Sequence, residues 1–181
     1  MKTYLALLKG VNVGGKKKIS MGGLKNELEN SGFQSVQTYL NSGNVLFKSD
    51  NNNKQLLAEA IEKQILASFE LSTAVLILDT QDLENILSLC PWKDLSQMNT
   101  SHVFANFLFD NPESINNELI DKYRKDSEEL FYFDNVIFMH CPMGMADSKL
   151  TTSLFEKATK VNNTARNWNT STKLLEKMKS L

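Results

Sequence analysis

Residues 4–18, YLALLKGVNVGGKKK, join an apolar run to a turn that is rich in glycine and lysine. The run from Tyr4 to Leu8 predicts a buried strand, and the segment from Ser20 to Asn30 predicts a helix. Glycine lets backbone N–H groups approach a ligand closely, and a helix N-terminus carries a partial positive charge. The connection between strand and helix is therefore predicted to hold an anion.

Strand-like and helix-like segments continue to alternate up to residue 78. Strand spacing recurs over 36–40 and 45–47, on either side of a turn at 41–44. A helical stripe covers 56–65, and an unbroken apolar run covers 74–78. The predicted order of elements is β-α-β-β-α-β, which is the split βαβ, or ferredoxin-like, pattern.

The second half repeats this order less regularly. We expect a short helix over 83–87, a strand over 102–109, a helix that begins at Asn111-Pro112, and a hairpin of strands 130–133 and 136–139. Two more helices are expected over 150–158 and 174–178, the last capped within 170–172. The chain is therefore predicted to be α+β, with ferredoxin-like subdomains over 1–80 and 81–181 that pack as one unit.

Composition narrows the class of protein. The chain has 181 residues, of which 41% are hydrophobic and 23% charged, and no apolar run approaches the ~20 residues that cross a bilayer. Cys90 and Cys141 have no metal-ligand spacing and read as free thiols. We expect a cytoplasmic protein with no membrane partner, no metal and no cofactor. No motif marks a catalytic residue, and the sequence does not fix an oligomeric state.

Charge is segregated along the chain, although the formal net charge is only −1. Residues 1–26 hold six lysines and no acid, and residues 157–181 hold six cations and one acid. The 130 residues between them hold eight cations and 20 acids. If the two ends meet, they build a positive surface that attracts phosphate groups. The alternative is ordinary solvated surface charge.

The segment from Gly10 to Lys16 matches the G-x-x-x-x-G-K spacing of a nucleotide-binding P-loop. The next residue should be Ser or Thr, whose hydroxyl binds Mg²⁺, but it is Lys17. The expected sheet is also antiparallel, unlike the parallel sheet of P-loop proteins. We therefore predict a looser anion site made by glycine N–H groups and lysines. A connection that needs glycine only for its turn is the alternative.

Residues 164–170, TARNWNT, form a second unusual stretch. Arg166 can bind a phosphate or carboxylate through two N–H groups, and Trp168 can stack on a planar ligand. In the alternative interpretation this is a loop anchored by Trp168, with its asparagines closing turns and capping the last helix. Lys149 precedes another predicted helix start and could face an anion there. Residues 39–44 are interpreted mainly as a turn.

These motifs define a predicted anion site and three candidate functions. The site comprises Lys9, Gly10, Asn12, Gly14, Gly15, Lys16, Asn41, Ser42, Asn44, Lys149, Arg166, Asn167, Trp168 and Asn169. In the first function the protein binds a phosphate-bearing ligand, either a small metabolite or a nucleic acid, although the aromatic strand signature of RNA-binding sheets is missing. In the second it is an enzyme acting on a small anionic metabolite, in which cationic side chains stabilise negative charge. In the third the motifs only join the two halves.

Four stretches together resemble a known bacterial family, the one catalogued as domain of unknown function 1697. They are residues 7–15 (LLKGVNVGG), 38–45 (TYLNSGNV), 148–151 (SKLT) and 164–170 (TARNWNT). The family usually has arginine at the position of Lys9, and lysine there loses the two-pronged contact with a planar anion. It usually has K-N-K at the position of residues 16–18. The resemblance covers nearly the whole chain and implies two ferredoxin-like halves, but no established activity, substrate or cofactor.

Overall fold

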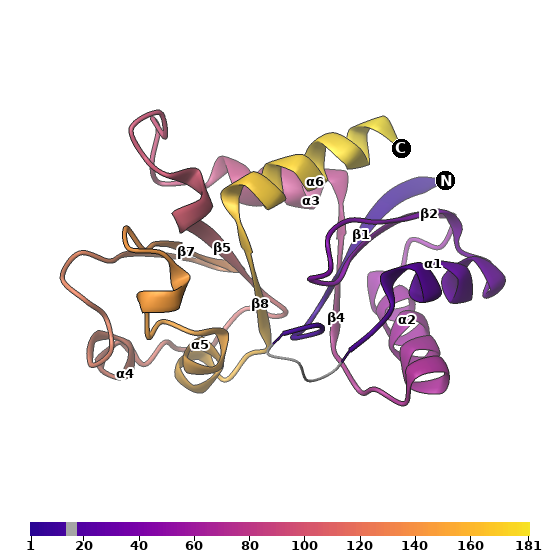
Figure 1. The fold of residues 1–181 in the computed structure, drawn as a ribbon, viewed down its shortest axis with the longest axis horizontal. Coiled ribbons are helices and arrows are strands. Elements are labelled where there is room, and N and C mark those ends of the chain that lie inside the picture. The colour runs from indigo at the N-terminus through magenta and orange to yellow at the C-terminus, as the bar shows by residue number, and fades with distance from the viewer. Residues whose placement is uncertain (14–17) are drawn as a thin grey trace. The chain divides into compact units, whose positions relative to one another are not determined.

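A computed structural model describes residues 1–13 and 18–181 (Figure 1). It is a mixed α+β structure, and the described residues form two four-stranded antiparallel sheets and six α-helices. The chain divides into unit 1, made of Met1–Glu84 and Leu174–Leu181, and unit 2, made of Asn85–Lys173. These units differ from the predicted subdomains because the last eight residues belong with the first 84.

Unit 1 contains one complete sheet, whose strand order is β2-β3-β1-β4 with every neighbouring pair antiparallel. Its elements are β1 (Lys2–Leu8), α1 (Met21–Asn30), β2 (Gln34–Thr38), β3 (Asn44–Ser49), α2 (Lys54–Phe69) and β4 (Val75–Asp79). The first residues of α3 (Thr80–Ser88) and the last of α6 (Trp168–Ser180) also belong to this unit. The element order predicted for residues 4–78 is confirmed.

Local sequence explains where the two long helices of unit 1 begin. Ser20 caps α1, because its Oγ accepts a hydrogen bond from the Gly23 N–H at 3.1 Å. Asn53 caps α2, because its Oδ1 accepts from the N–H groups of Gln55 and Leu56. The apolar stripes of both helices pack on one face of the sheet and form the core with residues such as Tyr4, Leu24, Phe47, Ile61 and Ile77.

The central strand of unit 1 is buried on both faces. Ala6 pairs with Val45 on one side and with Ile77 on the other, so β1 lies between β3 and β4. Tyr4, Ala6 and Leu8 belong to the core beneath the helices, and the intervening Leu5 and Leu7 are also buried. This arrangement accounts for the continuous apolar run in the sequence, since a strand exposed on one face would alternate with polar residues.

Unit 2 repeats the order of elements and of strands found in unit 1. It contains the end of α3, β5 (Val103–Leu108), α4 (Asn117–Asp121), β6 (Glu129–Phe133), β7 (Val136–His140), α5 (Thr152–Thr159), β8 (Asn163–Asn167) and the start of α6. The strands lie in the order β6-β7-β5-β8, again antiparallel. Short 3₁₀ helices cover Thr100–His102 and Met145–Asp147. A core under α4 and α5 includes Leu108, Ile120, Ile137, Leu150 and Phe155.

The structure corrects two predicted helix starts in the second half and adds one strand. The helix expected to begin at Asn111-Pro112 begins at Asn117, because the Asn116 side chain caps it by accepting from the Leu119 N–H at 2.9 Å. Residues 163–167 form strand β8, which pairs with β5 and was not predicted. The last helix begins at Trp168, where Asn167 Oδ1 accepts from the Thr170 N–H at 2.9 Å.

No helix in the described ranges 1–13 and 18–181 has both the length and the apolar composition that would be needed to span a membrane.

Candidate functional site

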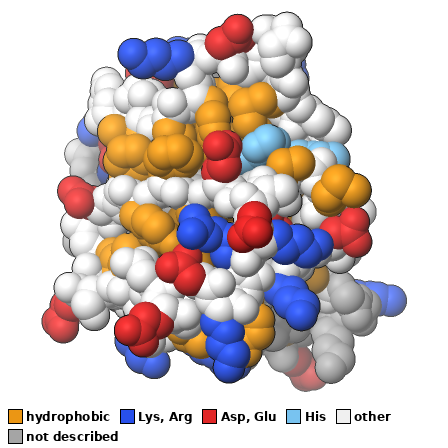
Figure 2. All heavy atoms as spheres, turned by 90° about the vertical axis from the view of Figure 1, so that its left-hand side faces the viewer, with side chains coloured by type: hydrophobic (Ala, Val, Ile, Leu, Met, Phe, Trp, Pro, Cys, Tyr) orange, Lys and Arg blue, Asp and Glu red, His pale blue; other side chains and the backbone are white. Residues whose placement is uncertain are grey.

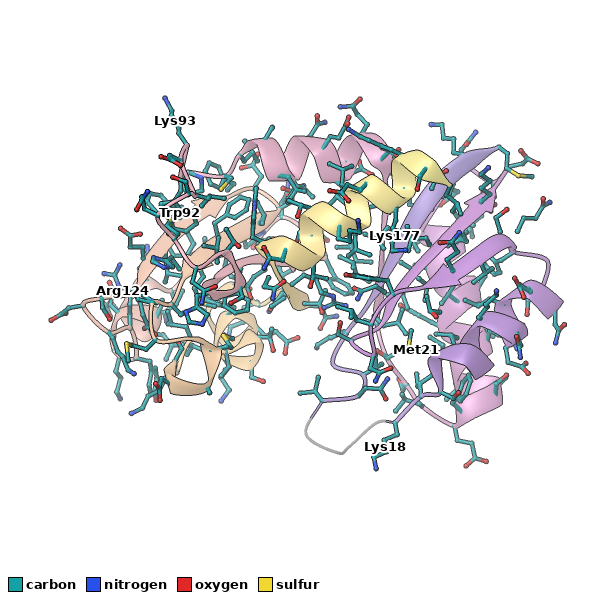
Figure 3. The ribbon with its side chains drawn as sticks, turned by 45° about the horizontal axis from the view of Figure 1, so that its top comes forward. Lys18, Met21, Trp92, Lys93, Arg124 and Lys177 are labelled. Atoms are coloured by element: carbon teal, nitrogen blue, oxygen red, sulfur yellow. The ribbon has the colours of Figure 1, made fainter. Side chains whose placement is uncertain are left out.

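A pocket of about 550 Å³ opens in unit 1 where the chain enters α1. Three sequence segments meet there: the loop after β1, the start of α1 and the tip of the β2–β3 hairpin. Its described lining residues are Asn12, Lys18, Ile19, Ser20, Met21, Gly22 and Asn41. Figure 3 shows Lys18 and Met21 at this entry to the helix. Two residues of the predicted anion site, Asn12 and Asn41, therefore line the same pocket.

Asn12 holds these segments together. Its Oδ1 accepts from the Ile19 N–H at 2.8 Å, and its Nδ2 donates to the carbonyl oxygens of Ile19 at 3.1 Å and Asn41 at 2.7 Å. The backbone of Asn12 has φ of 56°, a left-handed conformation that asparagine tolerates better than most residues. One side chain thus fixes both the helix entry and the hairpin tip beside the pocket.

Gly43 allows the hairpin tip to lie against the loop after β1. Its φ is +76°, and a Cβ added there would lie 2.5 Å from Val11 Cγ2 and 2.8 Å from Leu8 Cβ. No larger residue fits at this position without displacing its neighbours. The glycine in the 38–45 motif therefore has a packing role next to the pocket.

Among the described residues that line the pocket, the charged one is a lysine. Lys18 is exposed, and none of the described residues that line the pocket is acidic. The first turn of a helix has N–H groups without intrahelical acceptors, and the dipole of α1 adds partial positive charge at Met21 and Gly22. Ser20 Oγ takes only one of these N–H groups, that of Gly23. The described lining of the pocket therefore combines one exposed cation with a helix N-terminus and holds no acid.

The other predicted site residues of unit 1 have structural partners. The Lys9 N–H donates to Ala74 O at 3.0 Å, and Gly10 is exposed with φ of +63°. Asn44 is fully buried, and its Nδ2 donates to Tyr39 O at 2.8 Å and to Ser42 Oγ at 3.1 Å. These bonds close the hairpin turn. Gly14, Gly15 and Lys16 lie outside the described residues.

The C-terminal end of α6 brings basic residues into unit 1. The Lys177 ammonium lies 5.3 Å from the centre of the Tyr39 ring, a cation–π contact with the hairpin that carries Asn41. Lys179 forms an ion pair with Glu84. The two basic ends of the chain thus contribute to the same unit, and part of the C-terminal charge is neutralised within it.

Arg166 lies in unit 2, on β8, and is buried with 6% of its surface exposed. Its Nη1 donates to Thr164 Oγ1 and to Ala165 O, both at 2.8 Å. Burial lowers the pKa of Arg166 to about 10, so the side chain still carries its charge at neutral pH. The sequence predicts that Arg166 and the glycine-rich loop form one site. The two lie in different units, and their sharing a site stays a prediction.

The residues after Arg166 begin α6. Asn167 caps this helix, the Trp168 ring lies 6.5 Å from the Phe138 ring, and the Asn169 carbonyl accepts from the Thr172 hydroxyl at 3.2 Å. These contacts agree with the alternative interpretation, in which asparagines cap the last helix. Lys149 lies elsewhere in unit 2 and lines a different pocket from that of Asn12.

A cluster on the β6–β7 hairpin was not predicted. Glu129 Oε2 accepts from Trp92 Nε1 at 2.9 Å and lies 3.6 Å from His140 Nδ1. The Trp92 ring contacts both His140 and Phe131. Figure 2 shows hydrophobic and histidine side chains side by side on one face of the molecule. Glu129 and His140 are opposite each other in the register of the β6–β7 hairpin, so the predicted hairpin could have indicated this pair from the sequence.

Neither cysteine is placed for nucleophilic chemistry. Cys141 is buried, and burial raises the pKa of its thiol to about 11 although the hydrogen bond with the Ser148 hydroxyl lowers it. Burial also raises the pKa of the Cys90 thiol. Across the part of the chain that the structure describes, no three His, Cys, Asp or Glu side chains are grouped as metal ligands would be.

Comparison with known proteins assigns a family to this chain. A solved structure of the conserved bacterial protein SP0830 from Streptococcus pneumoniae is similar, with a TM-score of 0.64 and 25% sequence identity over 98% of each chain. Comparison with curated proteins finds no match. The family model described as "Protein of unknown function (DUF1697)" matches residues 1–138. The predicted family resemblance is confirmed: the chain belongs to the DUF1697 family, whose function is unknown.

Proposed function

We propose that the protein binds a small phosphate-bearing ligand in the pocket of unit 1 at the start of α1. The observation that carries this proposal is the pocket of about 550 Å³ in which a helix N-terminus, Lys18 and two asparagines meet with no described acid in the lining. Pockets of roughly 300–1,000 Å³ are typical of small-molecule sites. A nucleotide-sized metabolite therefore fits the pocket better than a nucleic-acid duplex.

Each lining group has a role in this proposal. The N–H groups of the first turn of α1 donate to phosphate oxygens, and the Lys18 ammonium adds a charge-assisted hydrogen bond. Asn12 fixes the loop, so little conformational entropy is lost when the ligand binds. In this proposal the N–H groups and the ammonium offset much of the phosphate charge.

The test is a phosphate titration followed by thermal unfolding at constant ionic strength. We expect the Tm to rise with phosphate concentration, because a ligand that binds only the folded state stabilises it. Lys18→Ala should weaken phosphate binding about tenfold, since a hydrogen bond between charged groups contributes about 1.5 kcal/mol or more.

The matched control is Lys48→Ala, which removes the same charge. Lys48 lies on β3 opposite Thr3, at the far end of β1 from the pocket. The proposal fails if phosphate does not raise the Tm of the unaltered chain, or if Lys18→Ala and Lys48→Ala reduce the phosphate-induced rise in Tm equally. A single-stranded oligonucleotide that binds at low salt and competes with phosphate would extend the ligand class to nucleic acid.

We also propose that each unit is a ferredoxin-like subdomain. The support is the shared β-α-β-β-α-β order and the shared strand order, in which the first and third strands are central. Expression of residues 85–173 alone tests this for unit 2, where a cooperative unfolding transition is expected and its absence would oppose the proposal.

A further inference from the structure

Unit 2 has a pocket of its own, of about 430 Å³, between α4 and α5. The two helices contact each other, and Figure 1 shows them side by side. The residues that define its chemistry are Leu119, Tyr123, Lys149, Ser153, Leu154 and Lys157. None of them lines the pocket of unit 1, so binding here is independent of the phosphate site proposed above.

One wall of this pocket is apolar. Leu119 lies on α4 and Tyr123 lies in the turn two residues after that helix ends, and both side chains line the pocket. Tyr123 is 38% exposed although it is a large aromatic residue, and Leu119 also packs against the core of the unit. Leu154 lies beside them on α5. This wall offers apolar contact to a ligand of modest size.

The lining of the pocket also carries two cations. Lys149 and Lys157 are both exposed, and within the described residues neither forms an ion pair. No described residue that lines the pocket is acidic. Unit 2 as a whole has more acidic than basic residues. A pocket lined by two lysines and no described acid therefore differs in charge from the rest of the unit.

The position of Lys149 also favours an anion in this pocket. It lies three residues before the first residue of α5, and the partial positive charge at a helix N-terminus favours an anion nearby. The Ser148 and Thr151 hydroxyls are occupied by the N–H groups of Leu150 and Leu154. The Ser153 hydroxyl, four residues before Lys157, has no partner among the described residues and can donate to a ligand.

We infer that this pocket binds an organic anion with a compact apolar body, such as an aromatic carboxylate or phosphate. The anionic group lies between Lys149 and Lys157 and accepts from Ser153. The apolar body packs against Leu119, Tyr123 and Leu154. Both parts are required, because a small inorganic anion leaves the apolar wall unused and a neutral aromatic leaves the lysines without a partner.

The experiment is a calorimetric titration of the full chain with benzoate and with phenyl phosphate. We expect both to bind, inorganic phosphate not to compete for benzoate, and benzyl alcohol to bind at least tenfold more weakly than benzoate. The double variant Lys149→Ala/Lys157→Ala should lose at least tenfold in benzoate affinity. Tyr123→Ser should also weaken benzoate, because it removes part of the apolar wall.

The matched control is Lys93→Ala, which removes an exposed lysine of unit 2 outside the pocket. It should bind benzoate as the unaltered chain does. Lys18→Ala should also leave benzoate binding unchanged, which separates this site from the one in unit 1. Absence of benzoate binding, equal binding by the double variant and the Lys93 control, or equal affinity for benzyl alcohol would overturn the inference.

Discussion

The side-chain amide of Asn12 donates to the carbonyl oxygen of Asn41 at 2.7 Å, although 29 residues separate the two along the chain. This hydrogen bond joins the loop after β1 to the tip of the β2–β3 hairpin. Since both residues line the pocket at the start of α1, the bond links the shape of the proposed site to the fold of unit 1.

Replacement of Asn12 should therefore affect stability and phosphate binding together. Asn12→Ala removes three side-chain hydrogen bonds and leaves a Cβ in the left-handed conformation at φ of 56° without the bonds that stabilise it, so we expect a loss of about 2–3 kcal/mol in the free energy of unfolding. Asn12→Gly loses the same bonds without the strain and should be about 1 kcal/mol less destabilised. Urea unfolding measures both. Equal stability of the two variants would contradict the role of the left-handed backbone.

Arg166 should contribute to stability without contributing to phosphate binding. Arg166→Met leaves Thr164 Oγ1 and the Ala165 carbonyl without these donors, so we expect a loss of about 1–3 kcal/mol in the free energy of unfolding. Arg124→Met is the control, because Arg124 is an exposed arginine paired with Asp121, and it should cost less than about 1 kcal/mol. The phosphate-induced rise in Tm should persist in both. Its loss in Arg166→Met alone would place Arg166 in the ligand site, as its sequence motif predicts.

Acid should destabilise unit 1 partly through Asp79. Burial favours the neutral carboxyl, but the backbone N–H of Asp82 and the Lys54 ammonium outweigh this effect and lower the pKa of Asp79. A lowered carboxyl pKa gives stability that is present above about pH 4 and is lost as the pH falls through the folded-state value.

Lys54→Met tests this linkage. With the ammonium removed and the carboxyl still partly buried, the pKa of Asp79 should rise, so the loss of Tm on acidification should begin at a higher pH than in the unaltered chain. Lys63→Met changes an exposed lysine of the same helix and should not move the profile. Parallel profiles of Tm against pH from acid to neutral for all three proteins would rule out the assigned role of Lys54.

The cysteines should react slowly and in a fixed order. Cys141 is 1% exposed and burial raises the pKa of its thiol to about 11, whereas Cys90 is only partly buried. Because the thiolate is the reactive form, a thiol reagent at mildly alkaline pH should label Cys90 first and Cys141 only in denaturant. Mass spectrometry of the labelled peptides distinguishes them. Rapid labelling of Cys141 in the folded protein would show that its surroundings open readily to solvent.

Sequence periodicity was sufficient to predict a helix or strand where the local sequence alone determines that element. The apolar run of β1 and the helical patterns over 20–30 and 56–65 predicted the first half of the fold correctly. β8 was missed because residues 163–167 are almost entirely polar, and they form a strand only by pairing with β5. The start of α4 was wrong because the Asn116 cap outweighed the helix-start signal of Asn111-Pro112.

The candidate site was only partly predictable for a related reason. The glycine-rich loop, the helix start and the hairpin turn were each recognisable as motifs from their composition. That Asn12 bonds to Asn41, and that Gly43 packs against Val11, depends on tertiary contacts that no local pattern encodes. The pairing of Glu129 with His140, by contrast, follows from the register of the predicted 130–133 and 136–139 hairpin, although the contact of Trp92 with both residues does not.

The central claim is that an anion binds at the first turn of α1. Its most direct test is a phosphate titration of the isotopically labelled protein, followed through the backbone amide NMR signals. We predict saturable shifts that are largest at Ile19, Met21 and Gly22 and are reduced in Lys18→Ala. Amide signals in this turn that stay unchanged at saturating phosphate, or shifts confined to other parts of the chain, would contradict the claim.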